Sequence, residues 1–196
     1  MIKIAITGGI GSGKTMVSNL LQTMGYVVFS CDKIANGVLN DPTVIKKIST
    51  FAKDCVIKNA NGTYQIDKKA LSNVVFTNEK LLQKLTDITH PLILTELLNQ
   101  INNANQNLVF AEVPILFEKN YQNYFDKIIV VTRPLNDRIN SVISRNNCTK
   151  QEVLNRINSQ FDYSKLNKSD YIVINNDKDI LALQTQIENI LKTLNS

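Results

Sequence analysis

Short apolar runs alternate with amphipathic segments along most of the chain. The apolar runs have the length of strands and little period-two alternation, which is typical of a parallel sheet covered on both faces. There are five of them: Ile2–Thr7, Val27–Ser30, Leu108–Glu112, Lys127–Thr132 and Tyr171–Ile174. Because helical patterns separate them, the sequence predicts an α/β fold with a doubly wound, five-stranded parallel sheet and helices on both faces.

The helical patterns next to these strands have recognisable starts and stops. Lys14–Met24 stops at Gly25, and Pro134–Arg145 opens with a proline, which a first helical turn tolerates. Thr149–Gln160 begins with a capping-box pattern. Asp177–Leu194 repeats apolar residues at helical spacing, which predicts a helix with one apolar face.

The segment between the second and third strands is much longer than one crossover helix needs. A turn is expected at Gly62, and Pro91 is expected to kink or break the last helical pattern. The rest of the segment is mostly helical in pattern, over Lys33–Leu39, Val44–Lys53, Lys68–Val75 and Glu79–Ile101.

We therefore expect one domain over residues 1–196, with a core made of 1–32 and 107–196. A helical lobe over about 33–106 is inserted into this core and helps to form a substrate cleft. Residues 136–160, called the lid segment below, form a lid.

Composition excludes several classes of protein. No apolar run reaches the roughly 18–20 residues that a membrane span needs, and no secretory signal is visible. The three cysteines, Cys31, Cys55 and Cys148, lack metal-site spacing and fit free thiols in a reducing cytoplasm. A net charge of +5 fits simple solubility or a phosphorylated small substrate. Nucleic-acid binding is not expected, because basic residues do not cluster with aromatic ones.

The strongest chemical signal is the run Gly8–Thr15, which fits G-x-x-x-x-G-K-[ST] between a strand and a helix. Glycines let the backbone turn its N–H groups toward phosphate oxygens, and the helix N-terminus adds a partial positive charge. Lys14 is expected on the β- and γ-phosphates of ATP, and the Thr15 hydroxyl on Mg²⁺. The predicted nucleotide-binding residues are Gly9, Ile10, Gly11, Ser12, Gly13, Lys14 and Thr15.

Acidic residues follow two of the predicted strands. Asp32 ends the second strand, where ligands of parallel sheets bind, and a carboxylate there can accept the proton of an attacking hydroxyl. The residues alone leave this role and a helix N-cap equally open. Glu112 ends the third strand, where it can hold Mg²⁺ through water, or it is a surface residue. Glu118 lies further from the sheet and has the same alternatives.

Basic residues after the fourth strand suggest a lid that neutralises phosphate charge. Arg138 and Arg145 are seven residues apart, so two helical turns place them on one face. A solvated helix face is the alternative interpretation. The run Asn167–Asp170 matches a guanine-binding motif, but a predicted strand follows it and no D-x-x-G motif accompanies it. We therefore expect ATP and not GTP.

Taken together, these pieces resemble the dephospho-CoA kinase family, P-loop kinases that complete coenzyme A synthesis. The likeness runs nearly end to end. It includes the phosphate loop, Asp32 with Ile34-Ala35, and the series Ile66–Leu71, His90-Pro91, Val113–Glu118, Arg156–Gln160 and Asp170–Asn175.

Several positions depart from the family pattern. Ser30 and Asn36 replace an aspartate and an arginine around Asp32. Ser141 replaces a lid arginine, and Arg138 can reach the same phosphate from one helical turn away. Lys68 replaces an arginine, which keeps the charge but loses the fork that binds two phosphate oxygens.

The resemblance implies transfer of the ATP γ-phosphoryl group to the ribose 3′-hydroxyl of dephospho-CoA, with Mg²⁺. It implies catalysis by Asp32, Lys14, Arg138 and Arg145, and a nucleotide contact from Asn175. Acceptor binding is assigned to Asp32, Lys68, His90 and Glu118. A cytoplasmic monomer or small homo-oligomer is expected. The alternatives are another small P-loop kinase, acting on a nucleotide, nucleoside or sugar acid, and an ATP-binding regulatory module.

Overall fold

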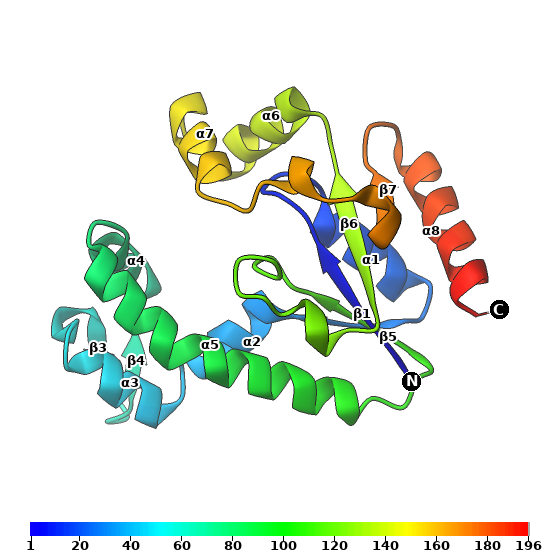
Figure 1. The fold of residues 1–196 in the computed structure, drawn as a ribbon. Helices are drawn as coiled ribbons and strands as arrows, with labels where there is room; N and C mark the ends of the chain where they lie inside the picture. The colour runs from blue at the N-terminus through cyan, green and yellow to red at the C-terminus, as the bar shows by residue number, and fades with distance from the viewer. Residues whose placement is uncertain (196) are drawn as a thin grey trace. The chain divides into compact units, whose positions relative to one another are not determined.

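Five strands form one sheet in the order β2-β5-β1-β6-β7 in this computed structural model, which describes residues 1–195 (Figure 1). The central strand β1 pairs parallel with β5 and β6, and β6 pairs parallel with β7. The strands are β1 (Ile2–Thr7), β2 (Val27–Ser30), β5 (Leu108–Glu112), β6 (Lys127–Thr132) and β7 (Ile172–Asn175). All five predicted strands are present, and only the last is shifted, by one residue.

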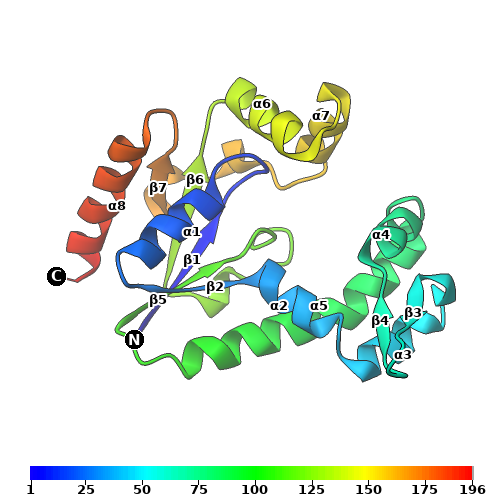
Figure 2. The ribbon, with the colours of Figure 1, turned by 180° about the vertical axis from the view of Figure 1, so that it is seen from behind.

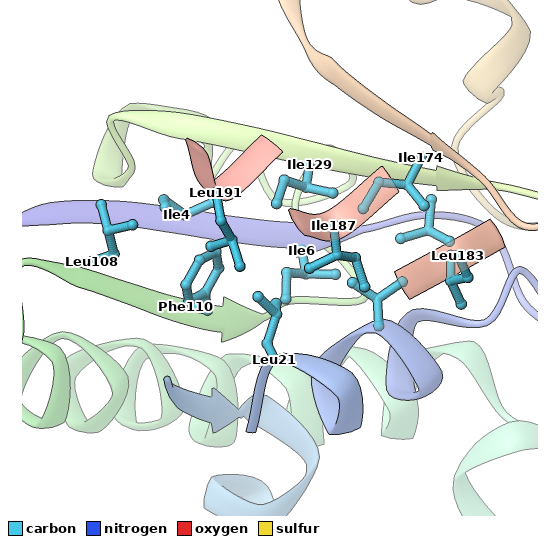
Figure 3. Packing of buried hydrophobic residues seen from close by; sticks show 12 residues of the cluster. Ile4, Ile6, Leu21, Leu108, Phe110, Ile129, Ile174, Leu183, Ile187 and Leu191 are labelled. Carbon is cyan, nitrogen blue, oxygen red and sulfur yellow. The ribbon is translucent and has the colours of Figure 1, made fainter. Parts of the chain in front are cut away.

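One face of the sheet packs against α1 (Lys14–Thr23) and α8 (Ile180–Leu194). Figure 3 shows side chains from β1, β5, β6 and β7 meeting those of the two helices in one apolar cluster. Ile4, Phe110 and Leu21 in this cluster are at most 1% exposed. Such complete burial of large apolar side chains supplies most of the stabilisation of a fold of this kind.

Alternate residues of the same strands are equally buried on the opposite face. Ala5, Val109 and Ala111 are fully inaccessible, and Val130 is 3% exposed. Burial on both faces explains why these strands are continuous apolar runs in the sequence. The expected α/β fold with a doubly wound parallel sheet is confirmed.

The lid segment is a pair of helices after β6, seen at the carboxyl ends of β1 and β6 in Figure 2. The helices α6 (Leu135–Asn146) and α7 (Lys150–Asn158) pack through Ile139, Val142 and Val153. Thr149 caps α7, and its capping box with Glu152 is present as predicted. The bonds from Thr149 hold the pKa of the Glu152 carboxyl below its ordinary value.

The chain divides into two compact units, one of Met1–Phe29 with the residues from Ala104 onward, the other of Ser30–Asn103. The second unit contains four helices and a small hairpin with their own apolar cluster, which includes Val44, Ile48 and Leu71. Its elements are α2 (Cys31–Val38), α3 (Pro42–Ser49), β3 (Val56–Lys58), β4 (Tyr64–Ile66), α4 (Lys68–Phe76) and α5 (Glu79–Asn102). The 3₁₀ turns of the two units are Lys53–Cys55, Gln122–Tyr124, Tyr163–Lys165 and Lys168–Asp170.

The second unit corrects two expectations. The break expected as one alternative at Pro91 is absent: α5 continues through Pro91 over 24 residues, because its packing against α2, α3 and α4 outweighs one missing hydrogen bond. The antiparallel hairpin β3–β4 was not predicted, because strands of three residues are too short to show an alternating pattern. Its turn contains Gly62, as expected.

The starts of two helices differ from the predictions by a few residues. Asp41 caps α3 ahead of Pro42, two residues earlier than predicted. Asp179 caps α8, so this helix begins at Ile180, three residues after the predicted start. Within residues 1–195, no helix is both long enough and apolar enough to cross a membrane.

Candidate active site

The phosphate loop, Gly8–Thr15, connects β1 to α1 within the first unit. Its backbone at Gly13 has φ 98°, a left-handed conformation that suits glycine. A Cβ on Gly13 would also lie 2.1 Å from the amide nitrogen of Asn176. The side chain of Asn176 is buried and donates its amide N–H to the Ser12 carbonyl at 2.9 Å. The sequence therefore keeps a glycine where a neighbouring side chain supports the loop.

Lys14 is turned back onto the loop that precedes it. Its Nζ donates to the carbonyl of Gly8 at 2.7 Å and to that of Gly9 at 3.2 Å. These bonds hold the ammonium group over the loop, where the phosphates of a nucleotide bind in this motif.

Thr15 and Glu112 are joined directly. The Thr15 hydroxyl donates to Glu112 Oε1, and the Ser18 hydroxyl donates to Glu112 Oε2, both at 2.9 Å. Glu112 is 7% exposed, and the two hydrogen bonds offset the free-energy cost of burying its carboxylate. The surface alternative for Glu112 is therefore wrong, and the two residues predicted to bind metal lie together.

Arg138 lies against the loop, whereas Arg145 does not. The guanidinium of Arg138 lies across Gly9, where a Cβ would be 2.3 Å from Nη2, and its Nε donates to the Ile10 carbonyl at 2.9 Å. Burial lowers the pKa of Arg138, and among residues 1–195 no carboxylate pairs with it. Arg145 is exposed and donates to the Asn146 side chain. A half-buried cation without an anion beside a phosphate loop is a ready partner for a phosphoryl group.

Two more side chains contact the loop from just after α7. Gln160 Oε1 accepts the Ile10 N–H at 2.7 Å. The Tyr163 hydroxyl is bonded to the Gly8 main chain and lies 3.1 Å from the Thr7 hydroxyl. Burial raises the pKa of Tyr163. The sequence patterns alone predict no role for these two side chains.

Asn175 and Glu118, two predicted site residues, make hydrogen bonds with different parts of the first unit. Asn175, the predicted nucleotide contact, accepts from the Thr132 hydroxyl at 2.8 Å, and its neighbour Asn176 contacts the loop instead. Glu118 accepts the Phe161 N–H at 3.1 Å through one oxygen. Its other oxygen is buried with no hydrogen-bond partner among the described residues.

In the second unit, Asp32 is the second residue of α2 and is not its cap. Ser30 is the N-cap, since its hydroxyl accepts the Lys33 N–H. The cap alternative for Asp32 is therefore wrong. The side chain of Asp32 is exposed, and within the described chain it makes no hydrogen bond or ion pair.

Lys68 contacts the same helix. Its Nζ donates to the Asn36 side chain at 2.6 Å, and Asn36 lies one helical turn beyond Asp32. The structure thus brings Lys68 to the face of α2 that carries Asp32. His90 is half-buried within α5, a helix that packs against α2.

The two units divide the predicted site between them. The first unit brings together the loop, Lys14, Thr15, Glu112 and Arg138. The second unit holds Asp32, Lys68 and His90. The catalytic, nucleotide, metal and acceptor roles given to these residues stay predictions.

Comparisons with known proteins cover nearly the whole chain. The family model described as Dephospho-CoA kinase matches residues 2–182. A Dephospho-CoA kinase of Carboxydothermus hydrogenoformans is 32% identical over 194 residues, which cover 96% of this chain and 92% of that protein.

Two solved structures resemble this one along its full length. The crystal structure of TT1252 from Thermus thermophilus has a TM-score of 0.82 at 28% identity and covers 98% of this chain and 97% of that chain. Dephospho-CoA kinase from Campylobacter jejuni has a TM-score of 0.72 at 25% identity, with 98% and 96% covered. The full-length match, together with the loop geometry above, shows that the chain belongs to the dephospho-CoA kinase family.

Proposed function

We propose that this chain transfers the γ-phosphoryl group of ATP to the ribose 3′-hydroxyl of dephospho-CoA, giving coenzyme A and ADP. The observation that carries the proposal is the family match over residues 2–182, because it spans the phosphate loop and also the unit that contains Asp32. A likeness confined to the loop would fit any P-loop kinase.

The phosphate side of the reaction is assigned to the first unit. Loop N–H groups bind the phosphates, and Lys14 exchanges its contacts with Gly8 and Gly9 for phosphate oxygens. Arg138, which has no paired carboxylate among residues 1–195, neutralises charge on the phosphoryl group in transfer. Catalysis of this kind is mainly positioning and electrostatic stabilisation.

The residues at Thr15 and Glu112 fit a magnesium ion. A hydroxyl oxygen and a buried carboxylate, 2.9 Å apart, are oxygen donors of the kind that Mg²⁺ prefers. Thr15 would hold the ion directly and Glu112 through water, and the bound ion would neutralise phosphate charge. The Thr15 hydroxyl can offer a lone pair to the ion while its O–H still donates to Glu112 Oε1, so the observed bond is compatible with both contacts.

The acceptor side is assigned to the second unit. Asp32 accepts the proton of the 3′-hydroxyl as that oxygen bonds to the γ-phosphorus and the bond to the ADP oxygen breaks. Its exposed carboxylate, which the described residues leave unpaired, is suited to this task because no internal bond must be broken first. We assign acceptor binding to Lys68, His90 and Glu118, and the protein to the cytoplasm.

An acceptor panel tests the proposed reaction. ADP release is measured in a coupled assay with ATP and Mg²⁺, and the product is identified by mass. Dephospho-CoA is expected to gain one phosphoryl group, whereas AMP, nucleosides and shikimate stay unchanged. Equal turnover of AMP or shikimate would favour another small P-loop kinase, and ATP hydrolysis with every acceptor intact would favour a regulatory module.

The role of Asp32 is tested by Asp32→Asn, which keeps the size of the side chain and removes its basicity. We expect kcat to fall by roughly 10²–10⁴-fold, while ATP binding, measured by calorimetry, is unchanged. Asp54, in a 3₁₀ turn of the same unit, provides the matched control Asp54→Asn. Near-normal turnover of Asp32→Asn would remove the base assignment without touching the identity of the acceptor.

A further inference from the structure

Both polar groups of the Ile10 main chain are bonded to side chains of the lid segment. The Ile10 N–H donates to Gln160 Oε1 at 2.7 Å, and the Ile10 carbonyl accepts from Arg138 Nε at 2.9 Å. Gln160 is 150 residues away along the chain and Arg138 is 128 residues away. The peptide groups at Ile10 are therefore oriented by side chains from outside the phosphate loop.

The side chain of Ile10 is held by the same segment. It packs against the apolar cluster of α6 and α7 that contains Ile139, Val142 and Val153. A rotation of the Ile10 backbone would break two hydrogen bonds and withdraw an apolar side chain from this cluster. Ile10 is consequently a point at which both the main chain and the side chain of the phosphate loop are joined to the lid segment.

Gln160 is itself held on both sides. Its own N–H donates to the Ile157 carbonyl at 3.2 Å, which closes the end of α7. The next residue, Phe161, donates its N–H to Glu118 and stacks its ring on Phe117 with the centroids 4.8 Å apart. The main-chain bond to Ile157 and the contacts of Phe161 together hold the half-buried Gln160 in place, so its side-chain oxygen is a well-positioned hydrogen-bond acceptor.

A phosphate loop binds nucleotides through N–H groups that face one point. The Ile10 N–H is occupied by Gln160, so phosphates must be bound by the N–H groups that follow it, and the Ser12 N–H must first release its 3.2 Å bond to the Gly9 carbonyl. We propose that Gln160 is a positioning residue for the reaction: it fixes the Ile10 peptide, and so the alignment of the following loop N–H groups for ATP. This inference rests on the proposed use of ATP and assigns Gln160 no contact with substrate.

The test uses variants that differ in hydrogen-bond capacity at similar size. Gln160→Met removes the acceptor oxygen. Gln160→Asn keeps an amide oxygen but shortens the side chain by one methylene, so that the oxygen no longer reaches the Ile10 N–H. Gln160→Glu keeps an acceptor at the same reach. Gln151→Met is the control, since Gln151 lies on the exposed face of α7 and its side chain bonds, among the described residues, only to Asn155.

Two readouts are combined in the full-length protein: hydrogen exchange of the Ile10 amide, followed by NMR, and the Kd for ATP. In Gln160→Met and Gln160→Asn we expect faster exchange at Ile10 and a Kd raised about tenfold, since one hydrogen bond is lost. Gln160→Glu keeps the protection of the Ile10 amide, and Gln151→Met matches the wild type in both measurements.

The inference is overturned if Gln160→Asn exposes the Ile10 amide to exchange while the Kd for ATP stays within twofold of the wild type. It is also overturned if the Ile10 amide stays protected in Gln160→Asn, even where Gln160→Met fails to fold. Because both readouts are taken without acceptor, a failure to phosphorylate dephospho-CoA would count against the proposed function alone.

Discussion

The two halves of the phosphate loop are supported by different parts of the first unit. The first half, Gly8–Ile10, is bonded by side chains from the lid segment and the turn after it: Arg138, Gln160 and Tyr163. The second half, Ser12–Thr15, is bonded by Asn176, just after β7, and by Glu112 at the end of β5.

These supports differ in how firmly they are fixed. Asn176 and Glu112 are 6% and 7% exposed and continue strands of a sheet with a large buried core. The lid helices are joined by a cluster with only three fully buried residues, Ile139, Val142 and Val153, among the described residues. A small cluster gives low local stability. We therefore expect the second half of the loop to be rigid and the first half to adjust when a nucleotide binds.

Replacing Lys14 is the most severe way to test this difference, because Lys14 belongs to the second half and bonds to the first. Lys14→Met is expected to lower kcat/KM by roughly 10³-fold, since a cation over the transferred phosphoryl group is lost. Steady-state kinetics with dephospho-CoA measure the effect. Lys150→Met, at the exposed start of α7, is the matched control. A loss below tenfold would mean that the ammonium group serves only the loop.

A methyl group added to each half separates rigid from adjustable support. In Gly13→Ala the Cβ meets Asn176 at 2.1 Å in a left-handed backbone, and the Kd for ATP is expected to rise about 10²-fold. In Gly9→Ala the Cβ meets the tip of Arg138, a flexible side chain, and a rise of about tenfold or less is expected. Calorimetric titration with ATP checks both. Equal losses would show that the two halves are equally rigid.

The two lid arginines sharpen the same comparison. Arg138→Ala is expected to lower kcat/KM about thirty-fold, because a guanidinium at the loop is lost. Arg145→Ala is expected to have a smaller effect, since that side chain is exposed beside Asn146. Steady-state kinetics of the two variants under identical conditions measure this difference in kcat/KM. If Arg138→Ala leaves kcat/KM unchanged, Arg138 does not replace the arginine that the family has at Ser141.

The smallest expected effect concerns pH. Burial raises the pKa of Tyr163, so at alkaline pH the unfolded chain releases this proton before the folded protein does. The free energy of unfolding should therefore fall as pH rises above about 10, the ordinary tyrosine value, toward the folded pKa. Tyr163→Phe removes this part of the decline. Urea unfolding at a series of pH values checks it, and parallel declines in both proteins would contradict it.

The sequence predicted the sheet well because burial on both faces leaves a continuous apolar run that needs no tertiary information. Helix starts were less certain, because a cap such as Ser30 or Asp179 lies outside the apolar pattern. The hairpin β3–β4 was missed because its strands are too short to have a period.

The site was predictable where chemistry fixes the spacing of residues along the chain. The loop motif gave Lys14 and Thr15, and position after a strand gave Glu112. Gln160 and Asn176 were missed because their bonds to the loop join residues 150 and 164 positions apart. The sequence holds a signal for both residues: Gln160 is the last residue of the family pattern Arg156–Gln160, and Asn176 directly follows Asn175, the predicted nucleotide contact.

The bond between Lys68 and Asn36 bears on how this sequence diverged from its relatives. Both residues stand where the family pattern has arginine, and here they are 2.6 Å apart. An arginine at position 36 offers no acceptor, so it could not make this bond to Lys68. The departure at position 36 therefore anchors Lys68, a predicted acceptor-binding residue, to the helix that carries Asp32.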